Sequence, residues 1–281
     1  MRLTKAALLL ILGVIFTFSC RTAEKKDAQK STVLRIISHN VWYGFTKVPE
    51  RKDSWIAWMK EQDPDIVSLQ ELNDYSAEKL AEDALRYGHP YSVLLKEEGF
   101  PTGITSRFPI EDVSRIREGF HHGLLRVQIE GIYVYVIHLH PSNWNTRSIE
   151  IKLILQDMAT LPKDSKIVLA GDFNTFSPLD SNFYSHGRLE TFFSERDALY
   201  GESNLHKGQL DYSVIREVMD YGLVDLEAGM RQASFQFPGT FPTLVEKEGD
   251  HGDQRRLDYV VASGNLAGKV IRADIISNDT T

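Results

Sequence analysis

The sequence predicts an α/β domain in which strands and helices alternate and polar side chains follow the ends of the strands. Short runs rich in β-branched residues alternate with amphipathic helical patterns over residues 33–281. One strand region, residues 124–140, contains Glu130-Gly131, which is typical of a two-residue hairpin turn and predicts antiparallel pairing. With 281 residues, 42% of them hydrophobic and 25% charged, the chain is long enough for one large domain or two small ones.

The first twenty residues have the pattern of an export signal. Arg2 and Lys5 precede an apolar run over residues 6–18, which is shorter than the roughly 20 residues needed to span a bilayer. Cys20, the only cysteine, lies where bacterial lipoprotein signal peptides place the lipidated cysteine; an ordinary signal peptide that ends near a cysteine is the alternative. We expect a signal peptide over 1–20, a flexible polar tether over 21–32, and a lipid-anchored protein of the bacterial cell envelope.

Composition restricts the partners of the remaining chain. Without Arg2 and Lys5 there are 30 basic and 39 acidic side chains, a formal net charge of −9. Such a balance disfavours tight non-specific binding of nucleic acid, which depends on neutralising phosphates, but a bound cation reverses the local sign at a metal site. A single cysteine excludes an internal disulfide. We expect one monomeric domain over residues 33–281.

Two predicted strands in the N-terminal half end in polar residues. Residues 33–40 run into Asn40, and residues 65–72 carry Glu71 near their end, where a buried carboxylate needs a partner or a metal. Between them, residues 50–62 have the spacing of a helix with one apolar face that covers a sheet. The side chains on that face are Trp55, Ile56, Trp58 and Met59.

The middle of the chain predicts a second helix and three strand regions. The helix covers residues 76–87 and ends at Gly88, and strands follow over 91–97, 102–108 and 124–140. The last region places His138 and His140 on the same face, directly before Pro141. They are either metal ligands or one strand-capping and one solvated histidine.

A long helix is predicted over residues 143–161, with Arg147 in its first turn and close in sequence to both histidines. Its expected buried stripe consists of Ile149, Leu153, Ile154 and Met158. Further on, a helix over 211–221 ends at Gly222, and strands are predicted over 255–263 and 269–277. Asp258 enters the first of these strands, where an ionised carboxylate needs a specific partner.

The most informative stretch covers residues 166–178. Ile167 to Ala170 predict a buried strand that stops at Gly171, after which Asp172 and Asn174 project to one side of an extended backbone. The alternative for this stretch alone is an Asx-type turn that closes a core strand. Because several other predicted strands also end in polar residues, a site across the top of a sheet sandwich is the better interpretation.

The candidate site residues are rich in oxygen donors and contain no thiol. They are Asn40, Glu71, His138, Asp172, Asn174 and Asp258. Oxygen donors of this kind favour Mg²⁺, Mn²⁺ or Ca²⁺ over Zn²⁺. During attack on a phosphate ester, a divalent cation and neutral donors such as Asn and His stabilise the phosphoryl oxygens, and a carboxylate suits the nucleophile side, where it accepts a proton.

Five short segments occur in the order found in the endonuclease/exonuclease/phosphatase superfamily, which the chain resembles over about residues 33–281. They are Ser38-His-Asn40, Leu69-Gln-Glu71, Ile137-His-Leu139, Gly171-Asp-Phe-Asn174 and Arg256-Leu-Asp-Tyr259. The resemblance implies the deoxyribonuclease I-like fold, a four-layered sandwich of two mixed, largely antiparallel sheets with helices on the outer faces. It also implies a metal-dependent hydrolase that acts on phosphate esters.

The resemblance implies a role for each matching residue. Glu71 is similar to the principal metal ligand, and Asn40 to the neighbour that helps to hold metal or phosphate. Asp172 is similar to the group that orients or deprotonates the attacking water, and Asn174 to the amide that binds the phosphoryl oxygens. His138 is similar to the histidine that contacts the phosphate or assists the leaving group.

One departure from the family pattern concerns the partner of Asp258. Family members carry a Ser-Asp-His segment near the C-terminus, whose histidine is held by the acid equivalent to Asp258, whereas this sequence continues only with Ile276-Ser-Asn-Asp-Thr-Thr281. We therefore expect the chain to be incomplete at its C-terminus, with His251 as a possible substitute for the histidine.

The sequence thus predicts an exported, divalent-metal-dependent phosphoesterase, anchored to the membrane by its lipid. Nuclease, phospholipid phosphodiesterase and phosphatase activities share these residues, so the phosphate-ester substrate stays open. The alternative is a non-catalytic binding lipoprotein that keeps the fold with a degraded active site.

Overall fold

The computed structural model describes residues 33–231, 239–243 and 249–276. The chain divides into two units, Met1–Val33 and Leu34–Thr281, and all described helices and strands belong to the second. The predicted signal peptide, its lipidated Cys20 and the tether lie outside the described residues. In the described part, no helix is long and apolar enough to cross a membrane.

The described strands form two mixed sheets. The first has the order β1-β2-β4-β3, in which β1 and β2 run parallel and the other neighbours are antiparallel. The second has the order β5-β6-β7-β8-β10-β9, in which only β7 and β8 run parallel. The strands are β1 Ile36–Asn40, β2 Ile66–Gln70, β3 Tyr91–Leu94, β4 Gly103–Ser106, β5 Glu111–Ile116, β6 Leu124–Ile129, β7 Ile132–His138, β8 Lys166–Asp172, β9 Leu223–Asp225 and β10 Asp258–Ser263.

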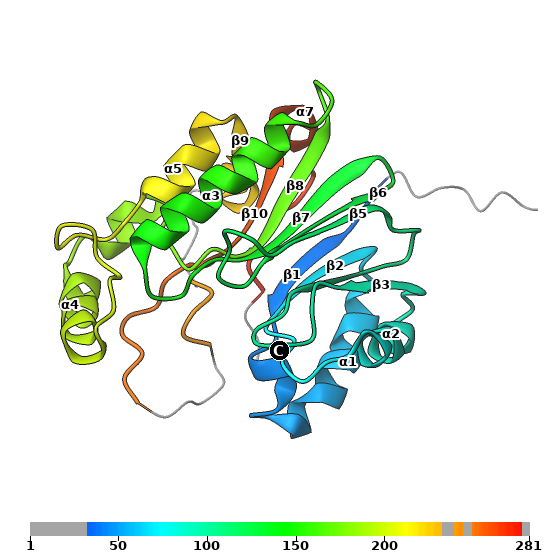
Figure 1. Cartoon of the computed structure of the whole chain (residues 1–281), viewed down its shortest axis with the longest axis horizontal. Coiled ribbons are helices and arrows are strands. Elements are labelled where there is room, and N and C mark those ends of the chain that lie inside the picture. The colour runs from blue at the N-terminus through cyan, green and yellow to red at the C-terminus, as the bar shows by residue number, and fades with distance from the viewer. Residues whose placement is uncertain (1–32, 232–238, 244–248, 277–281) are drawn as a thin grey trace, which may run out of the picture. The chain divides into compact units, whose positions relative to one another are not determined.

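The sheets face each other and helices cover their outer faces (Figure 1). Apolar side chains of both sheets, among them Ile66, Ile104 and Val168, fill the space between them. Helices α1 (Lys52–Gln62) and α2 (Ala77–Arg86) pack on the four-stranded sheet, and α3 (Trp144–Ala159) and α5 (Ser213–Asp220) pack on the six-stranded one. The predicted four-layered sandwich is confirmed.

Local sequence rules account for most of these elements. The Ser76 hydroxyl caps α2 by accepting the Lys79 N–H, and the Asn143 side chain caps α3 by accepting the Thr146 N–H. The turn at Glu130-Gly131 joins β6 to β7 in antiparallel register, as predicted. The four apolar side chains predicted to face inward from α1 are all buried.

Two predictions about strands and helices are wrong, and the strands β5 and β9 were not predicted. A strand was expected over residues 269–277, but none is present over the described residues 269–276, because β8 and β9 already occupy both sides of β10. The edge strand β5 was missed because its side chains are mostly polar and exposed. In α3, Ile149 is half exposed, and the buried face instead carries Arg147, Glu150 and Ile151.

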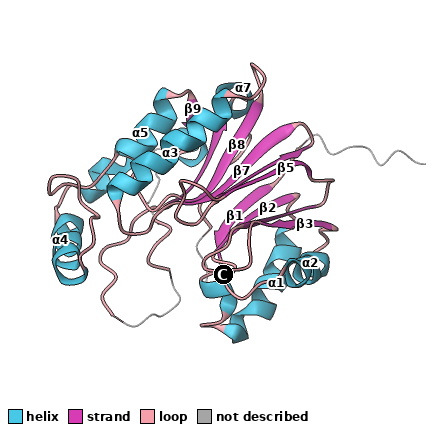
Figure 2. Cartoon of the chain, viewed as in Figure 1, coloured by secondary structure: helices cyan, strands magenta, loops and turns pink. Residues whose placement is uncertain are grey.

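The stretch after β8 contains elements that the sequence pattern did not indicate. Helix α4 (Arg188–Tyr200) stands away from the sheets (Figure 2) and packs through Leu189 and Phe193 on Phe176 and Tyr184. The short helices in the described residues are α6 Leu226–Met230, α7 Gly264–Ala267 and the 3-10 turns η1 Tyr43–Phe45, η2 Pro49–Arg51 and η3 Pro178–Tyr184. Helix α4 and the turn η3 lie in the chain between β8 and β9 and join neither sheet.

Candidate active site

The polar residues predicted at the strand ends meet at one edge of the two sheets. In the six-stranded sheet, His138 of β7 lies beside Asp172 of β8, and Asp258 of β10 lies opposite Asp172. Residues directly opposite each other in antiparallel strands project to the same face. From the other sheet, the end of β1 brings Asn40 against the same carboxylate.

Asn40 connects the two carboxylates of the site. Its Nδ2 donates to Glu71 Oε1 at 2.9 Å and to Asp172 Oδ2 at 3.1 Å, and its Oδ1 accepts the Trp42 N–H. One amide therefore joins the four-stranded sheet to the six-stranded sheet through their acidic residues. The amide nitrogen of Asn40, and not its oxygen, faces Glu71.

The backbone after β1 and β2 is bent to complete this arrangement. Glu71 adopts a positive φ of 57°, a conformation that L residues rarely adopt and that often marks functional sites. Its Oε2 accepts the Tyr43 N–H at 3.0 Å. The adjacent Gly44 approaches the Asn73 carbonyl so closely that a Cβ would lie 2.2 Å from the oxygen. A larger residue at position 44 would therefore displace the segment that holds Glu71.

Asp172 and Asn174 lie at the end of β8 as predicted. Asp172 Oδ1 accepts the Asn174 N–H at 2.9 Å, and Asn174 Nδ2 donates to the Leu139 carbonyl at 3.0 Å. This is the Asx-type turn considered above as the alternative for this stretch, and it is present together with the cluster of polar side chains. Gly171 allows the close approach of β7, because a Cβ there would lie 2.0 Å from the Ile137 carbonyl oxygen.

The pKa of the Asp172 carboxyl is far above its ordinary value. Its pKa is raised to about 7, first because burial disfavours the ionised form and then because the Glu71 carboxylate repels it. The Asn174 N–H and the Asn40 amide act in the opposite direction. A carboxyl with a pKa near neutrality is well matched to accept a proton from water.

His138 is buried against this carboxyl. Its Nε2 lies 3.7 Å from Asp172 Oδ2, too far for a strong hydrogen bond, and its ring is 4% exposed. Burial lowers the pKa of His138 to about 4, although the Glu71 charge opposes this shift. The imidazole is therefore neutral at pH 7 and offers one N–H donor.

Two histidines that the sequence patterns did not single out pack against His138 and His140. The His122 ring stacks on His138, with ring centroids 4.2 Å apart, and the His121 ring lies 4.1 Å from that of His140. The buried Glu150 carboxylate fixes this region by accepting the backbone N–H groups of His121 and His140. The adjacent pair His121-His122 was the available sequence signal, but it lies in a loop between strands.

Arg147 of α3 contacts the backbone that follows β7. Its side chain is 1% exposed, and its Nη1 donates to the His140 carbonyl at 3.1 Å. Burial lowers the pKa of Arg147 to about 10, although the carboxylates of Asp211 and Glu150 oppose the shift, so the group stays charged at neutral pH. Arg147, which is close to both histidines in sequence, thus also contacts the backbone of one of them.

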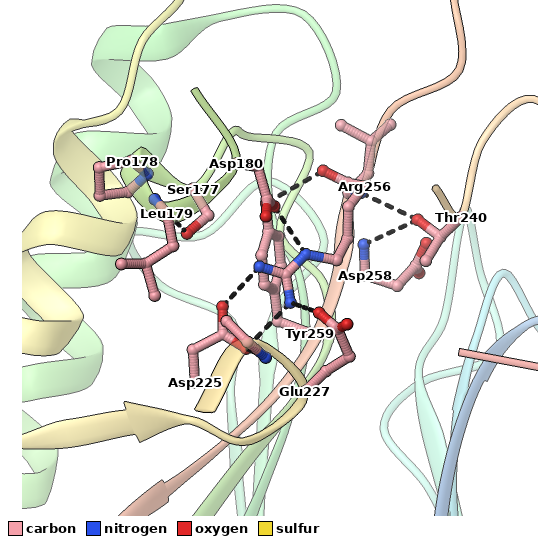
Figure 3. Close-up of polar contacts among 12 residues, drawn as sticks. Ser177, Pro178, Leu179, Asp180, Asp225, Glu227, Thr240, Arg256, Asp258 and Tyr259 are labelled. Carbon is pink, nitrogen blue, oxygen red and sulfur yellow. Dashed lines mark hydrogen bonds and ion pairs between the residues drawn. The ribbon is translucent and has the colours of Figure 1, made fainter. Parts of the chain in front are cut away.

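The start of β10 is fixed by a buried ion network around Arg256, the first residue of the Arg-Leu-Asp-Tyr segment (Figure 3). Its guanidinium donates to Asp180 at 2.8 Å, to Asp225 at 2.6 and 2.9 Å, and to Glu227 at 2.8 Å. The Tyr259 ring lies 4.4 Å from the guanidinium carbon. These contacts join η3, β9 and α6 to the strand that carries the next site residue.

That residue, Asp258, is held by its backbone, since its N–H donates to the Thr240 hydroxyl at 3.2 Å (Figure 3). Its predicted role as an orienting acid stays a prediction. The same holds for His251 as a substitute histidine: its ring lies edge-on to Phe241, and its backbone carbonyl accepts from Arg255.

The donors around Glu71 fit a hard cation that keeps much of its water. Among the described residues, no three His, Cys, Asp or Glu side chains converge closely enough to hold a metal ion by themselves. Mg²⁺, however, is usually held by one or two carboxylates with several waters. From the described part of the chain, each Glu71 oxygen accepts a single hydrogen bond, from Asn40 or from Tyr43, and so keeps lone pairs for a cation.

The sequence model of the Endonuclease/Exonuclease/phosphatase family matches residues 37–279. The chain belongs to this family. The match contains all six residues proposed for the site, from Asn40 to Asp258, and family members are generally dependent on divalent metals. No curated protein matches the sequence.

Solved structures of family enzymes share the fold. An AP endonuclease from Archaeoglobus fulgidus is 20% identical with a TM-score of 0.58, over 84% of this chain and 89% of that one. The 3′-5′ exonuclease NExo from Neisseria meningitidis is 15% identical with a TM-score of 0.56, over the same shares. A TDP2 from D. rerio, solved with a single-stranded DNA product, is 17% identical with a TM-score of 0.53, over 82% and 83%. The chain therefore has the fold of nucleases and phosphoesterases.

Proposed function

We propose that this protein is a divalent-cation-dependent hydrolase of phosphate esters. The observation that carries the proposal is the Asn40 amide, which holds the carboxylates of Glu71 and Asp172 within hydrogen-bond distance of one group, with neutral His138 beside them. Two close carboxylates repel each other, and a cation relieves that repulsion while attracting an anionic ester.

The charged and the neutral side chains of the site have different proposed roles. Asp172, with its pKa near 7, orients the attacking water and accepts its proton. His138 and Asn174 are neutral donors, which bind phosphoryl oxygens without repelling them. Glu71 would hold the cation, which supplies positive charge against the phosphoryl oxygens. Asn40 keeps Glu71 and Asp172 at a fixed separation.

The substrate class follows in part from the relatives. An AP endonuclease, an exonuclease and a protein solved with a DNA product act on or bind nucleic acid. The net charge of −7 disfavours a long polyanion bound mainly through its phosphates. We therefore expect the chain to cleave a single ester that reaches the site, such as a nucleic-acid end, a phospholipid head group or a small phosphate ester.

The test is a hydrolysis assay with DNA, bis-p-nitrophenyl phosphate and sphingomyelin micelles, each with Mg²⁺ and after EDTA. We expect hydrolysis of at least one ester, its loss with EDTA and its return when Mg²⁺ is added in excess. Hydrolysis that resists EDTA contradicts the metal requirement. A folded protein that cleaves none of the three, with Mg²⁺, Mn²⁺ or Ca²⁺, supports the non-catalytic alternative.

We further propose that the protein is exported and held at the bacterial envelope by lipidation of Cys20. The support is the sequence pattern of residues 2–20, since a short apolar run before a single cysteine is typical of lipoprotein signals. Cys20→Ser should move the protein from the membrane fraction to the soluble fraction. If the variant stays in the membrane pellet after a high-salt wash, lipidation is not the anchor.

A further inference from the structure

His122 occupies a position that suits a second phosphate-binding imidazole. Its ring stacks on that of His138 with the centroids 4.2 Å apart and the planes 19° apart. The two rings are therefore in direct stacking contact. Because His138 lies beside Asp172, His122 lies one residue further from that carboxyl. His122 is therefore close to the proposed site although it comes from the loop between β5 and β6.

The loop holds His122 in place through several independent contacts. The neighbouring His121 N–H donates to Glu150 Oε1 at 2.7 Å, and the other oxygen of this buried carboxylate accepts the His140 N–H at 2.9 Å. Glu150 thus joins the histidine loop to the end of β7. The Phe100 ring packs edge-on against both His122 and His138. The imidazole is fixed by its surroundings before any substrate arrives.

A nitrogen of His122 is buried without a hydrogen-bond partner. The side chain is 5% exposed, and Nε2 has no partner among the described residues. A buried polar atom without a partner is unfavourable, and a ligand that supplies an acceptor removes this cost. If this ring only filled space beside His138, a phenylalanine would fill the same space without burying a polar atom.

We propose that His122 Nε2–H donates a hydrogen bond to a phosphoryl oxygen of the bound ester, beside the donor supplied by His138. This inference rests on the proposed function and adds a residue to it. Burial and the neighbouring imidazoles lower the pKa of His122, so the ring is neutral and can supply an N–H without carrying a charge into the site. Two adjacent neutral donors stabilise the charge that develops on the phosphoryl oxygens.

The experiment compares His122→Phe with His121→Phe as a matched control. Phenylalanine keeps the stacked aromatic ring at position 122 and removes only its nitrogens. Removing one such donor lowers kcat by roughly 10² to 10³. We expect a loss of this size for His122→Phe on bis-p-nitrophenyl phosphate, carried by kcat, and a change of less than about threefold for the exposed His121. Urea unfolding midpoints confirm that both variants are folded.

Calorimetric titration with inorganic phosphate gives a second readout that does not depend on turnover. We expect His122→Phe to weaken phosphate binding and His121→Phe to leave it unchanged. If His122→Phe does not fold, His122→Asn provides the test, because its amide retains an N–H donor and should keep more activity than His122→Ala.

Three results would overturn the assignment. Wild-type turnover and phosphate affinity in folded His122→Phe would show that the ring only packs. Equal losses in the two phenylalanine variants would show that the loop, and not the nitrogen, matters. A wild-type protein that neither hydrolyses an ester nor binds phosphate would refute the proposed function itself, and this inference with it.

Discussion

Replacement of Arg256 should destabilise the domain strongly, because its charge is compensated entirely inside the protein. The side chain is 1% exposed, and its guanidinium donates four hydrogen bonds of 2.6–2.9 Å to carboxylates of Asp180, Asp225 and Glu227. Arg231 also contacts Asp180 and Glu227, so Asp225 is the carboxylate most dependent on Arg256. Arg256→Met keeps most of the length of the side chain and removes the charge.

The expected cost follows from what the substitution leaves behind. Breaking a buried ion pair by removing one partner costs roughly 3–5 kcal/mol, because the other charge stays buried without compensation. The control is Arg272→Met: Arg272 pairs with Asp274, but its side chain is 82% exposed. Exposed pairs contribute roughly 0–1 kcal/mol. The two arginine substitutions should therefore differ by several kcal/mol.

Urea unfolding monitored by tryptophan fluorescence measures both variants. Adding Asp225→Asn to Arg256→Met should restore part of the lost free energy of unfolding, since it removes the uncompensated charge. A cost below about 1 kcal/mol for Arg256→Met, or no recovery in the double variant, would refute the view that this network stabilises the start of β10.

Three further predictions concern metal binding, catalysis and acid stability. Glu71→Gln should weaken Mg²⁺ binding measured by calorimetry, because a neutral amide is a poorer ligand; unchanged affinity would remove Glu71 from the metal site. His138→Ala should lower turnover of a phosphodiester by roughly 10² to 10⁴ with the fold intact, and near-wild-type turnover would make this histidine structural. Buried His89, which bonds Thr105 and the Pro64 carbonyl, has a pKa lowered by burial, so the folded state binds fewer protons than the unfolded state. The stability it contributes is present above pH 6.5 and decreases as the pH falls below that value. Urea unfolding at pH 5 and 7.5 should show a smaller pH dependence for His89→Gln than for wild type; an equal dependence would contradict the assignment.

The sequence was sufficient to predict which residues meet at the site. Asn40, Glu71, His138 and Asp172 each follow a run of apolar residues, and the ends of such runs meet at one edge when the strands pair. Polar residues at these ends can be recognised because the core strands leave few other positions for them. The sandwich itself was implied by the resemblance of five short segments to a known family, and not by this rule.

The sequence was insufficient where burial depends on partners far along the chain. From the sequence, Glu150 and Arg147 fall outside the apolar stripe expected for α3. Both are buried because the loop that carries His121 and the end of β7 pack over them. His122 lies in a loop, where no periodic pattern indicates its orientation. The strand predicted over 269–277 failed for a related reason, since β9 takes the available edge of β10.

We propose that Asp172 is the proton acceptor of a metal-dependent phosphoesterase. The most direct measurement is turnover of bis-p-nitrophenyl phosphate by the wild type and by Asp172→Asn, both saturated with Mg²⁺. The asparagine keeps the size of the side chain and cannot accept the proton, so the rate should fall by roughly 10² to 10⁴ while the urea unfolding midpoint stays the same or rises. Wild-type turnover in a folded Asp172→Asn protein would contradict the account.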